Sequence, residues 1–209
     1  MEQICPPYAT GESCPAAFGD SFSAQCKNIS LEIFSEISEA AAKHGGEIIF
    51  DFGCGTGEST RLIAEQNPGC FIIGMDKSLE RIRKAGEKFG RGENYLLLRA
   101  EVIDIWRLAI DAGWRLKQHH ILYPNPWPKK AHLKRRWHGH PAFADLLKMG
   151  GELILRSNWE LYLEEFAAAV EIAKKTKAAV QSVSPQKYIS CLKKYAESGQ
   201  DLFEVNVTL

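Results

Sequence analysis

The chain has 209 residues, of which 45% are hydrophobic and 25% are charged, and its formal net charge is zero. This length and composition are typical of one globular domain and exclude a fibrous or disordered chain. No apolar run approaches the roughly 18 residues that cross a membrane, and the first residues lack the basic end and apolar core of a signal peptide, so we expect a cytoplasmic protein with no membrane partner.

Residues 1–29 are rich in Pro, Gly, Ser and Cys and show no periodicity. We therefore expect an irregular N-terminal arm ahead of one domain over residues 30–209. From there the hydrophobic periodicity predicts strands and helices that alternate. In chain order we predict a helix over 30–43, a strand over 48–52, a helix over 59–66, a strand over 70–75, a helix over 78–89, a strand over 95–98, a helix over 102–112, a strand over 120–123, a helix over 141–148, a strand over 153–155, a helix over 159–175, and late strands over 178–183 and 202–207.

The predicted strands are nearly all apolar, and helices separate most of them. This pattern is typical of a parallel sheet that is covered on both faces. Two late strands with no helical pattern between them would add an antiparallel edge. The sequence therefore predicts an α/β fold of the Rossmann-like kind.

A glycine-rich turn follows the first predicted strand and opens a helix. Its glycines are Gly53, Gly55 and Gly57, preceded by Asp51. A nicotinamide-binding turn needs a third glycine where this chain has Glu58, and an acid there would repel a pyrophosphate at the helix N-terminus. S-adenosylmethionine has no phosphate, and Asp51 can meet its positive groups directly or through water. The turn therefore favours S-adenosylmethionine as the cofactor.

Two further acids follow the next two predicted strands. Asp76 ends the second strand, where a carboxylate can accept hydrogen bonds from both ribose hydroxyls, and Glu101 follows the third strand, within reach of an adenine. The alternatives are that Asp76 caps the helix near Ser78 and that Glu101 interacts with a helix dipole. Three acids at three successive strand ends favour a cofactor site.

A loop with three prolines follows the fourth predicted strand, in residues 123–130. Proline restricts the backbone, so the loop suits a site that grips a planar base. Asn125 offers a donor and an acceptor, and Trp127 can stack on a base for roughly 1–3 kcal/mol. The alternative for Trp127 is packing beneath the loop.

The charges are segregated along the chain. Residues 112–144 contain no Asp or Glu but seven Lys and Arg, and residues 172–196 contain no Asp or Glu but six Lys. Segregated charge can build a basic face on a neutral protein, so we expect segments 115–136 and 174–194 to bind nucleic acid. Lys129, Lys134, Arg135 and Arg136 would contact phosphates. The alternative is that these segments are separate solvated surfaces.

The six cysteines include no Cys-x-x-Cys pair. In a reducing compartment they are expected to be free thiols. A zinc site from Cys5, Cys14, Cys26 and a distant histidine is the alternative, but these spacings match no common zinc motif. We expect no metal.

Residues 124–129 together with residues 132–136 resemble the signature of bacterial tRNA (guanine-N7)-methyltransferases, which has Pro-Asp-Pro-Trp followed by Lys and His-x-Lys-Arg-Arg. The resemblance extends over about residues 48–170. It implies a class I methyltransferase fold with a mostly parallel seven-stranded sheet, helices on both faces and an antiparallel edge. It also implies methyl transfer from S-adenosylmethionine to N7 of a guanine in tRNA.

The resemblance assigns roles to individual residues. It implies that Asp51, Asp76, Glu101 and Asn125 bind the cofactor, with Asn125 at the position treated as catalytic. It implies that Lys129, Asn158 and the segment with Asp201, Phe203 and Glu204 contact the substrate.

The chain departs from the family pattern at three of these positions. Asn125 and Asn158 replace aspartates, and Asp201 replaces a threonine. An amide still accepts one hydrogen bond from guanine but loses the charge-assisted share, roughly 1–2 kcal/mol each. Guanine N7 has a lone pair and no proton, so its attack needs no general base and depends on alignment. We therefore expect an active N7-methyltransferase; the alternatives are methylation of another base or amine, and an RNA-binding paralogue without activity.

Overall fold

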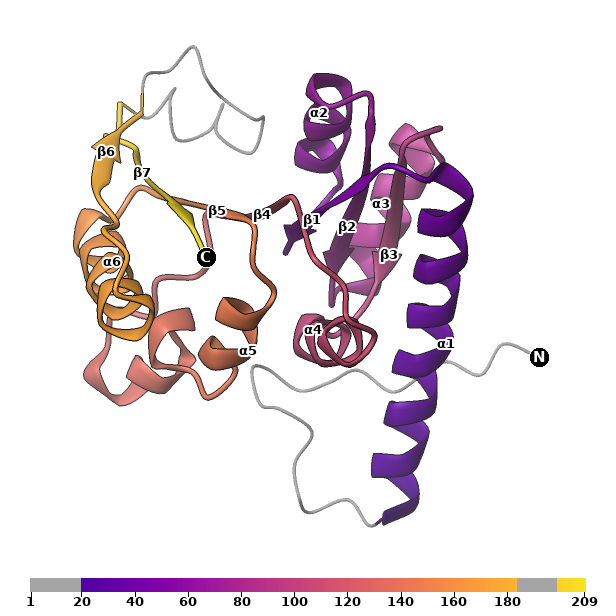
Figure 1. Ribbon diagram of the computed structural model, residues 1–209, viewed down its shortest axis with the longest axis horizontal. Coiled ribbons are helices and arrows are strands. Elements are labelled where there is room, and N and C mark those ends of the chain that lie inside the picture. The colour runs from indigo at the N-terminus through magenta and orange to yellow at the C-terminus, as the bar shows by residue number, and fades with distance from the viewer. Residues whose placement is uncertain (1–19, 184–198) are drawn as a thin grey trace.

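The computed structural model describes residues 20–183 and 199–209, with side chains described from residue 28 onward. Helices lie on both sides of a central sheet (Figure 1). The α-helices are α1 (Asp20–His44), α2 (Glu58–Gln66), α3 (Leu79–Phe89), α4 (Val102–Asp111), α5 (Phe143–Lys148) and α6 (Glu160–Lys174), and two 3-10 helices are η1 (Lys130–Arg135) and η2 (Trp137–Gly139). The strands are β1 (Glu47–Phe52), β2 (Cys70–Asp76), β3 (Tyr95–Arg99), β4 (Gln118–Leu122), β5 (Glu152–Ser157), β6 (Val180–Ser182) and β7 (Phe203–Thr208).

The strands form one seven-stranded sheet in the order β3-β2-β1-β4-β5-β7-β6. Strands β1 to β5 pair in parallel, whereas β7 runs antiparallel to both β5 and β6. The sheet confirms the predicted fold class, including the antiparallel edge.

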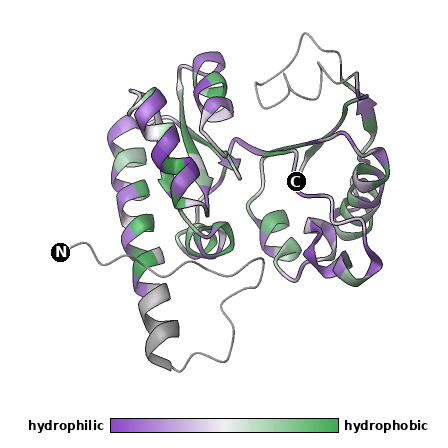
Figure 2. Ribbon diagram, turned by 180° about the vertical axis from the view of Figure 1, so that it is seen from behind, coloured by the Kyte–Doolittle hydropathy of each residue, from purple (hydrophilic) through white to green (hydrophobic). Residues whose placement is uncertain are grey.

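Alternate residues of the central strands face two different hydrophobic clusters. Phe50 of β1 and Ile73 of β2 pack in the larger cluster with Trp106 of α4, whereas Ile49 of β1 packs with Ile63 of α2. Side chains alternate across a strand, so both faces of the sheet are buried. In Figure 2 the helices alternate between hydrophobic and hydrophilic residues, as helices with one buried face do.

The order of the strands determines where a ligand can bind. From β1 the chain moves outward to β2 and β3 and then returns to β4 on the other side of β1. In open α/β sheets, ligands bind beyond the carboxyl ends of the strands at such a reversal. We therefore expect a ligand site at the carboxyl ends of β1, β2, β3 and β4.

Several boundaries differ from the sequence prediction by a few residues, and the largest difference is at the start of α1. Helix α1 begins at Asp20 rather than near Ser30, so the irregular arm predicted over residues 1–29 is helical from Asp20 onward, and residues 1–19 lie outside the described part. The Ser30 hydroxyl donates to Asp104 of α4 at 2.9 Å, which places it within a packed helix rather than at its start. Strand β4 ends at Leu122, because Tyr123 has a φ of 53° that no strand allows.

Within the described residues, no helix is both long and apolar enough to cross a membrane. Among the described side chains, no group of three or more His, Cys, Asp or Glu could hold a metal ion. Cys70 is buried without a disulfide. Cys5, Cys14 and Cys26 lie outside the residues whose side chains are described.

Candidate active site

A cavity of about 750 Å³ lies at the carboxyl ends of the parallel strands. It receives residues from the ends of β1, β2 and β3 on one side, and from the loop after β4, with η1 and η2, on the other. The lining residues are Phe52, Gly53, Asp76, Lys77, Arg81, Ala100, Glu101, Val102, Ile103, Ile121, Leu122, Tyr123, Pro124, Asn125, Trp127, Lys134, Arg135, Trp137 and His140.

The glycine turn connects β1 to α2, and its Gly53 lines the cavity. Gly53, Gly55 and Gly57 all have positive φ, at 70°, 59° and 76°, which is the left-handed region that favours glycine. The N–H of Gly53 donates to the Met75 carbonyl at 2.8 Å and so ties the turn to β2. A Cβ on Gly57 would lie 2.7 Å from Leu97 Cδ1, so no larger residue fits without a shift.

Asp51 lies beneath this turn, buried, rather than in the cavity wall. Its Oδ2 accepts hydrogen bonds from the Ser59 hydroxyl at 2.6 Å and the Thr60 hydroxyl at 2.7 Å. Its Oδ1 has no hydrogen-bond partner in the described part of the chain. Burial raises the pKa of Asp51 from 3.8 to about 6. The carboxyl group therefore anchors the start of α2 and keeps one oxygen for another partner.

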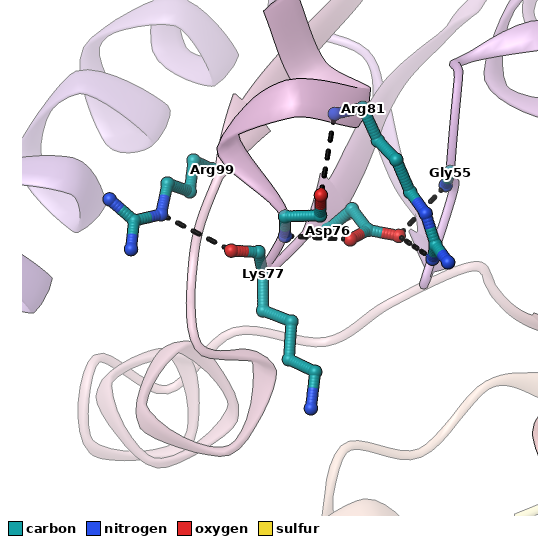
Figure 3. Close-up of polar contacts among 6 residues, drawn as sticks. Gly55, Asp76, Lys77, Arg81 and Arg99 are labelled. Atoms are coloured by element: carbon teal, nitrogen blue, oxygen red, sulfur yellow. Dashed lines mark hydrogen bonds and ion pairs between the residues drawn. The ribbon is translucent and has the colours of Figure 1, made fainter. Parts of the chain in front are cut away.

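Asp76 lies at the cavity and holds three groups together (Figure 3). Its Oδ1 accepts from the Ser78 N–H at 2.8 Å, and its Oδ2 accepts from the Gly55 N–H at 3.1 Å and from Arg81 Nη1 at 3.4 Å. The cap of α3 is Ser78, whose hydroxyl accepts from the Arg81 N–H, so Asp76 is not the helix cap. Asp76 therefore links the glycine turn to the β2–α3 junction.

Glu101 lines the same cavity from the start of α4. Loss of solvation raises its pKa, and the nearby carboxylate of Asp104 adds to this, while Lys77 acts in the opposite direction.

The proline-containing loop closes the other side of the cavity. Tyr123 and Trp127 have φ of 53° and 46°, which is uncommon for residues with a side chain. The Asn125 Oδ1 accepts from the Trp127 N–H at 3.2 Å. The guanidinium of Arg135 stacks on the Trp127 ring at 4.8 Å, and the ring of His132 meets its edge at 5.3 Å. The structure thus brings Asn125, Trp127 and Arg135 together.

Arg136 was predicted to contact a phosphate, but the structure buries it. Its side chain is only 4% exposed. Its Nε and Nη2 both donate to the Trp127 carbonyl at 3.2 Å, its Nη1 pairs with Glu165 of α6, and its guanidinium stacks on Trp159 at 4.9 Å. Such a buried group is not available to RNA, so Arg136 holds the loop from the inside.

The remaining predicted substrate residues do not line the cavity. Asn158 Nδ2 donates to Gln200 Oε1 at 2.6 Å, and Glu204 pairs with Arg156 at 2.5 Å. Phe203 pairs with Ser157 of β5 in the sheet. Asp201 is exposed just before β7, and Lys129 is exposed at the N-terminus of η1. These residues lie beside the β5–β7 pair or on the outer surface.

The predicted basic face is divided between two edges of the sheet. Lys117 precedes β4, at the amino edge, and pairs with Glu47 at 2.9 Å. Lys174 ends α6, and its Nζ donates to the Leu147 carbonyl at 3.5 Å. Neither belongs to the cavity side. Lys187, Lys193 and Lys194 lie outside the described residues.

Among the cavity residues that the sequence prediction missed are two that carry a positive charge, Lys77 and Arg81. Lys77 follows β2 directly, and Arg81 lies in the first turn of α3, at the end of the sheet where Asp76 lies. Their position after a predicted strand was the available signal, but they belong to neither of the two segments that are free of acidic residues.

Comparisons with known proteins place this chain in a family. A family model described as "Putative methyltransferase" matches residues 45–206. A tRNA (guanine-N(7)-)-methyltransferase of Methylobacillus flagellatus is 25% identical over 173 residues, covering 80% of this chain and 72% of that protein. One of Francisella philomiragia is 29% identical over 186 residues, covering 84% and 76%.

Solved structures show the same fold. An antibiotic-related methyltransferase superposes with a TM-score of 0.59 at 17% identity, covering 84% of this chain and 94% of that one. The 16S rRNA methyltransferase KamB superposes with a TM-score of 0.59 at 18% identity, covering 84% and 93%. The sheet is therefore that of the class I methyltransferases, and the chain, matched over residues 45–206, belongs to the family described as "Putative methyltransferase".

Proposed function

We propose that this protein transfers a methyl group from S-adenosylmethionine to N7 of a guanine in tRNA. One observation carries the proposal: Asn125 and Trp127 face the same cavity as Asp76 and Glu101. The loop that resembles the tRNA (guanine-N7)-methyltransferase signature therefore adjoins the predicted cofactor site. The relatives that carry that name support the substrate, and a cytoplasmic location follows from a tRNA substrate.

The residues of the cavity suit S-adenosylmethionine. Small-molecule sites are commonly about 300–1,000 Å³, and this cavity of about 750 Å³ falls within that range. The glycine turn presents backbone without side chains, the Asp76 carboxylate can accept from ribose hydroxyls, and Glu101 lines the same cavity, where it can meet the adenine. Asp51 lies beneath the turn and has an oxygen without a partner among the described residues, which can accept from a water that bridges to the cofactor. When bound, this cofactor supplies an electrophilic methyl group.

The loop after β4 provides for the base. Trp127 can stack on a purine, and its backbone is fixed at the N–H by Asn125 and at the carbonyl by Arg136. A fixed aromatic platform aligns N7 with the methyl group, and such alignment is the main requirement for a nucleophile that has no proton to lose. No general base is needed, so the amide at Asn125 is compatible with turnover.

The test is mass spectrometry of nucleosides from an unmodified tRNA transcript after incubation with the protein and S-adenosylmethionine. We expect a 7-methylguanosine peak that the Asp76→Ala variant fails to produce. The matched control is Glu87→Ala, which removes an exposed carboxylate of α3 that pairs with Arg83 outside the cavity. Equal methylation of guanine-free RNA would refute guanine as the target, and tRNA binding without any methylated nucleoside would refute catalysis on tRNA.

A further inference from the structure

Positively charged side chains enter the cavity from two separate parts of the chain. Lys77 and Arg81 follow β2, whereas Lys134 and Arg135 belong to η1. Strands β2 and β4 have only β1 between them, so their ends are about 10 Å apart at the usual spacing of strands. The two pairs of cations therefore stand on either side of the place where cofactor and base would meet.

The cofactor alone does not explain these charges. Among the described residues that line the cavity, four Lys and Arg face two carboxylates, Asp76 and Glu101. The neighbouring His140 adds no full charge at neutral pH, because burial lowers its pKa. S-adenosylmethionine is itself positive overall, since its sulfonium adds to a zwitterionic amino acid. An excess of cations around a cationic cofactor is unfavourable unless a polyanion joins the complex.

The geometry of Lys77 and Arg81 fits a contact beyond the cofactor. Figure 3 shows the Lys77 side chain extending away from the Asp76 carboxylate. The backbone of Lys77 is braced by Arg99, whose Nε donates to the Lys77 carbonyl at 3.2 Å. The Arg81 side chain is 63% exposed, and its Nη1 makes one long contact with Asp76 Oδ2, at 3.4 Å. The other N–H groups of the guanidinium can therefore donate to a second anion.

We infer that Lys77 and Arg81 bind RNA phosphates on the cofactor side of the target base, while Lys134 and Arg135 bind phosphates on the other side. This inference rests on the proposed function, since it names how the RNA strand crosses the same site. Enzymes that modify a base must take it out of its stack, and phosphate contacts set the register of the strand. Contacts on both sides hold the flanking backbone while the base enters.

The test compares Lys77→Gln, Arg81→Gln and the double variant with wild type in equilibrium binding to an unmodified tRNA transcript at several salt concentrations. Each lost phosphate contact reduces the slope of log K against log salt by about 0.7–0.9, so the double variant is expected to lose about 1.4–1.8. The matched control is Arg83→Gln on the same helix, because Arg83 is exposed, pairs with Glu87 and lies outside the cavity. Its slope is expected to equal that of wild type.

Affinity for S-adenosylmethionine is measured in parallel by calorimetry. We expect the double variant to bind it as tightly as wild type or more tightly. Unchanged salt slopes, or weaker cofactor binding with unchanged tRNA binding, would overturn the inference and assign both cations to the cofactor. The binding measurements do not depend on turnover. A protein that failed to methylate tRNA would therefore refute the proposed function, whereas the salt slopes would still test the phosphate contacts of Lys77 and Arg81.

Discussion

Arg135 and Arg136 are neighbours in the sequence, yet their surroundings differ completely. Arg135 is exposed and stacks on the face of Trp127, whereas Arg136 is buried and bonds to the carbonyl of the same residue. The run of Lys and Arg in residues 129–136 therefore contains both a surface residue and an internal clamp. Arg136 also pairs with Glu165 of α6, so it fixes the position of the loop relative to that helix.

This difference predicts opposite effects of the same substitution. Arg135→Met should reduce the salt slope of tRNA binding by about 1 and leave stability nearly unchanged. Arg136→Met should leave the salt slope unchanged, lower the free energy of unfolding by roughly 1–3 kcal/mol because the Trp127 carbonyl loses its buried donors, and lower kcat more than it raises KM. Urea unfolding, filter binding and steady-state kinetics on both variants check this. If Arg136→Met reduced the salt slope of tRNA binding as much as Arg135→Met, Arg136 would be shown to contact a phosphate.

The buried carboxyl group of Asp51 lowers the stability of the fold when it is charged. Its pKa is about 6 in the folded protein against 3.8 ordinarily. The folded state therefore binds the extra proton, and the contribution to the free energy of unfolding falls as pH rises from about 4 to about 6. Above that range the buried carboxylate is charged, which is the form that the proposed binding of a cationic cofactor would use.

Asp51→Asn removes this buried charge and keeps an acceptor for Ser59 and Thr60. We expect the variant to be more stable than wild type at pH 7, by roughly 2–3 kcal/mol at most, and to bind S-adenosylmethionine more weakly. We also expect wild-type cofactor affinity to fall below about pH 6 and the affinity of the variant to lack that step. Calorimetry across pH measures both, and a step retained in the variant would exclude Asp51 as its origin.

At the scale of elements, the glycine turn and the proline-containing loop reach fixed shapes by different means. The turn depends on residues without a Cβ, as at Gly57. The loop has prolines at 124, 126 and 128, which donate no backbone hydrogen bonds, so its shape depends on Asn125 and on Arg136 from outside the loop. The prolines predict rigidity, but they do not predict the clamp.

Two glycines test the role of the turn. Gly57→Ala should lower the free energy of unfolding by at least 1–2 kcal/mol, roughly the cost of a left-handed conformation, and more because its Cβ would meet Leu97. Gly86→Ala, within α3 where an added Cβ meets nothing within 4 Å, should raise it by about 0.5–1 kcal/mol. Chemical denaturation of both proteins gives the comparison, and stabilisation by Gly57→Ala would contradict the geometry.

At the scale of the whole molecule, the central strand β4 makes the fold sensitive to acid. His119 and His120 are buried, and burial lowers their pKa values to about 4 and about 3. The unfolded chain binds protons at these residues below about pH 6.5, whereas the folded protein does not. Their contribution to stability is therefore fully present above pH 6.5 and is lost as pH falls toward these values.

His120→Leu is expected to reduce the loss of stability as pH falls below 6.5. The Nδ1 of His120 has no hydrogen-bond partner in the described structure, so leucine loses only the bond to Gln118. The melting temperature of wild type should fall steeply from pH 6.5 toward pH 4, and that of the variant less steeply. Parallel profiles for the two proteins would show that His120 does not report on acid unfolding.

The charge pattern shows where prediction from the sequence stopped. The two basic segments were predicted to build one face, but Lys117 and Lys174 lie at the amino edge of the sheet, away from the cavity. Lys77 and Arg81, which belong to no such segment, line the cavity. Charge along the chain does not determine charge in space, because parallel strands send consecutive segments to alternating edges.

The sequence by itself determined the alternation of strands and helices, the antiparallel edge and the carboxyl-end positions of Asp76, Glu101 and Asn125, because hydrophobic period and motif spacing are local properties. Only the tertiary structure decided that Arg136 is buried, that Asp51 lies beneath the turn rather than in the wall, and that Asn158 and Glu204 turn to partners beside the cavity. Burial and pairing depend on segments distant in the chain, and no local pattern records which of two adjacent arginines will meet Glu165.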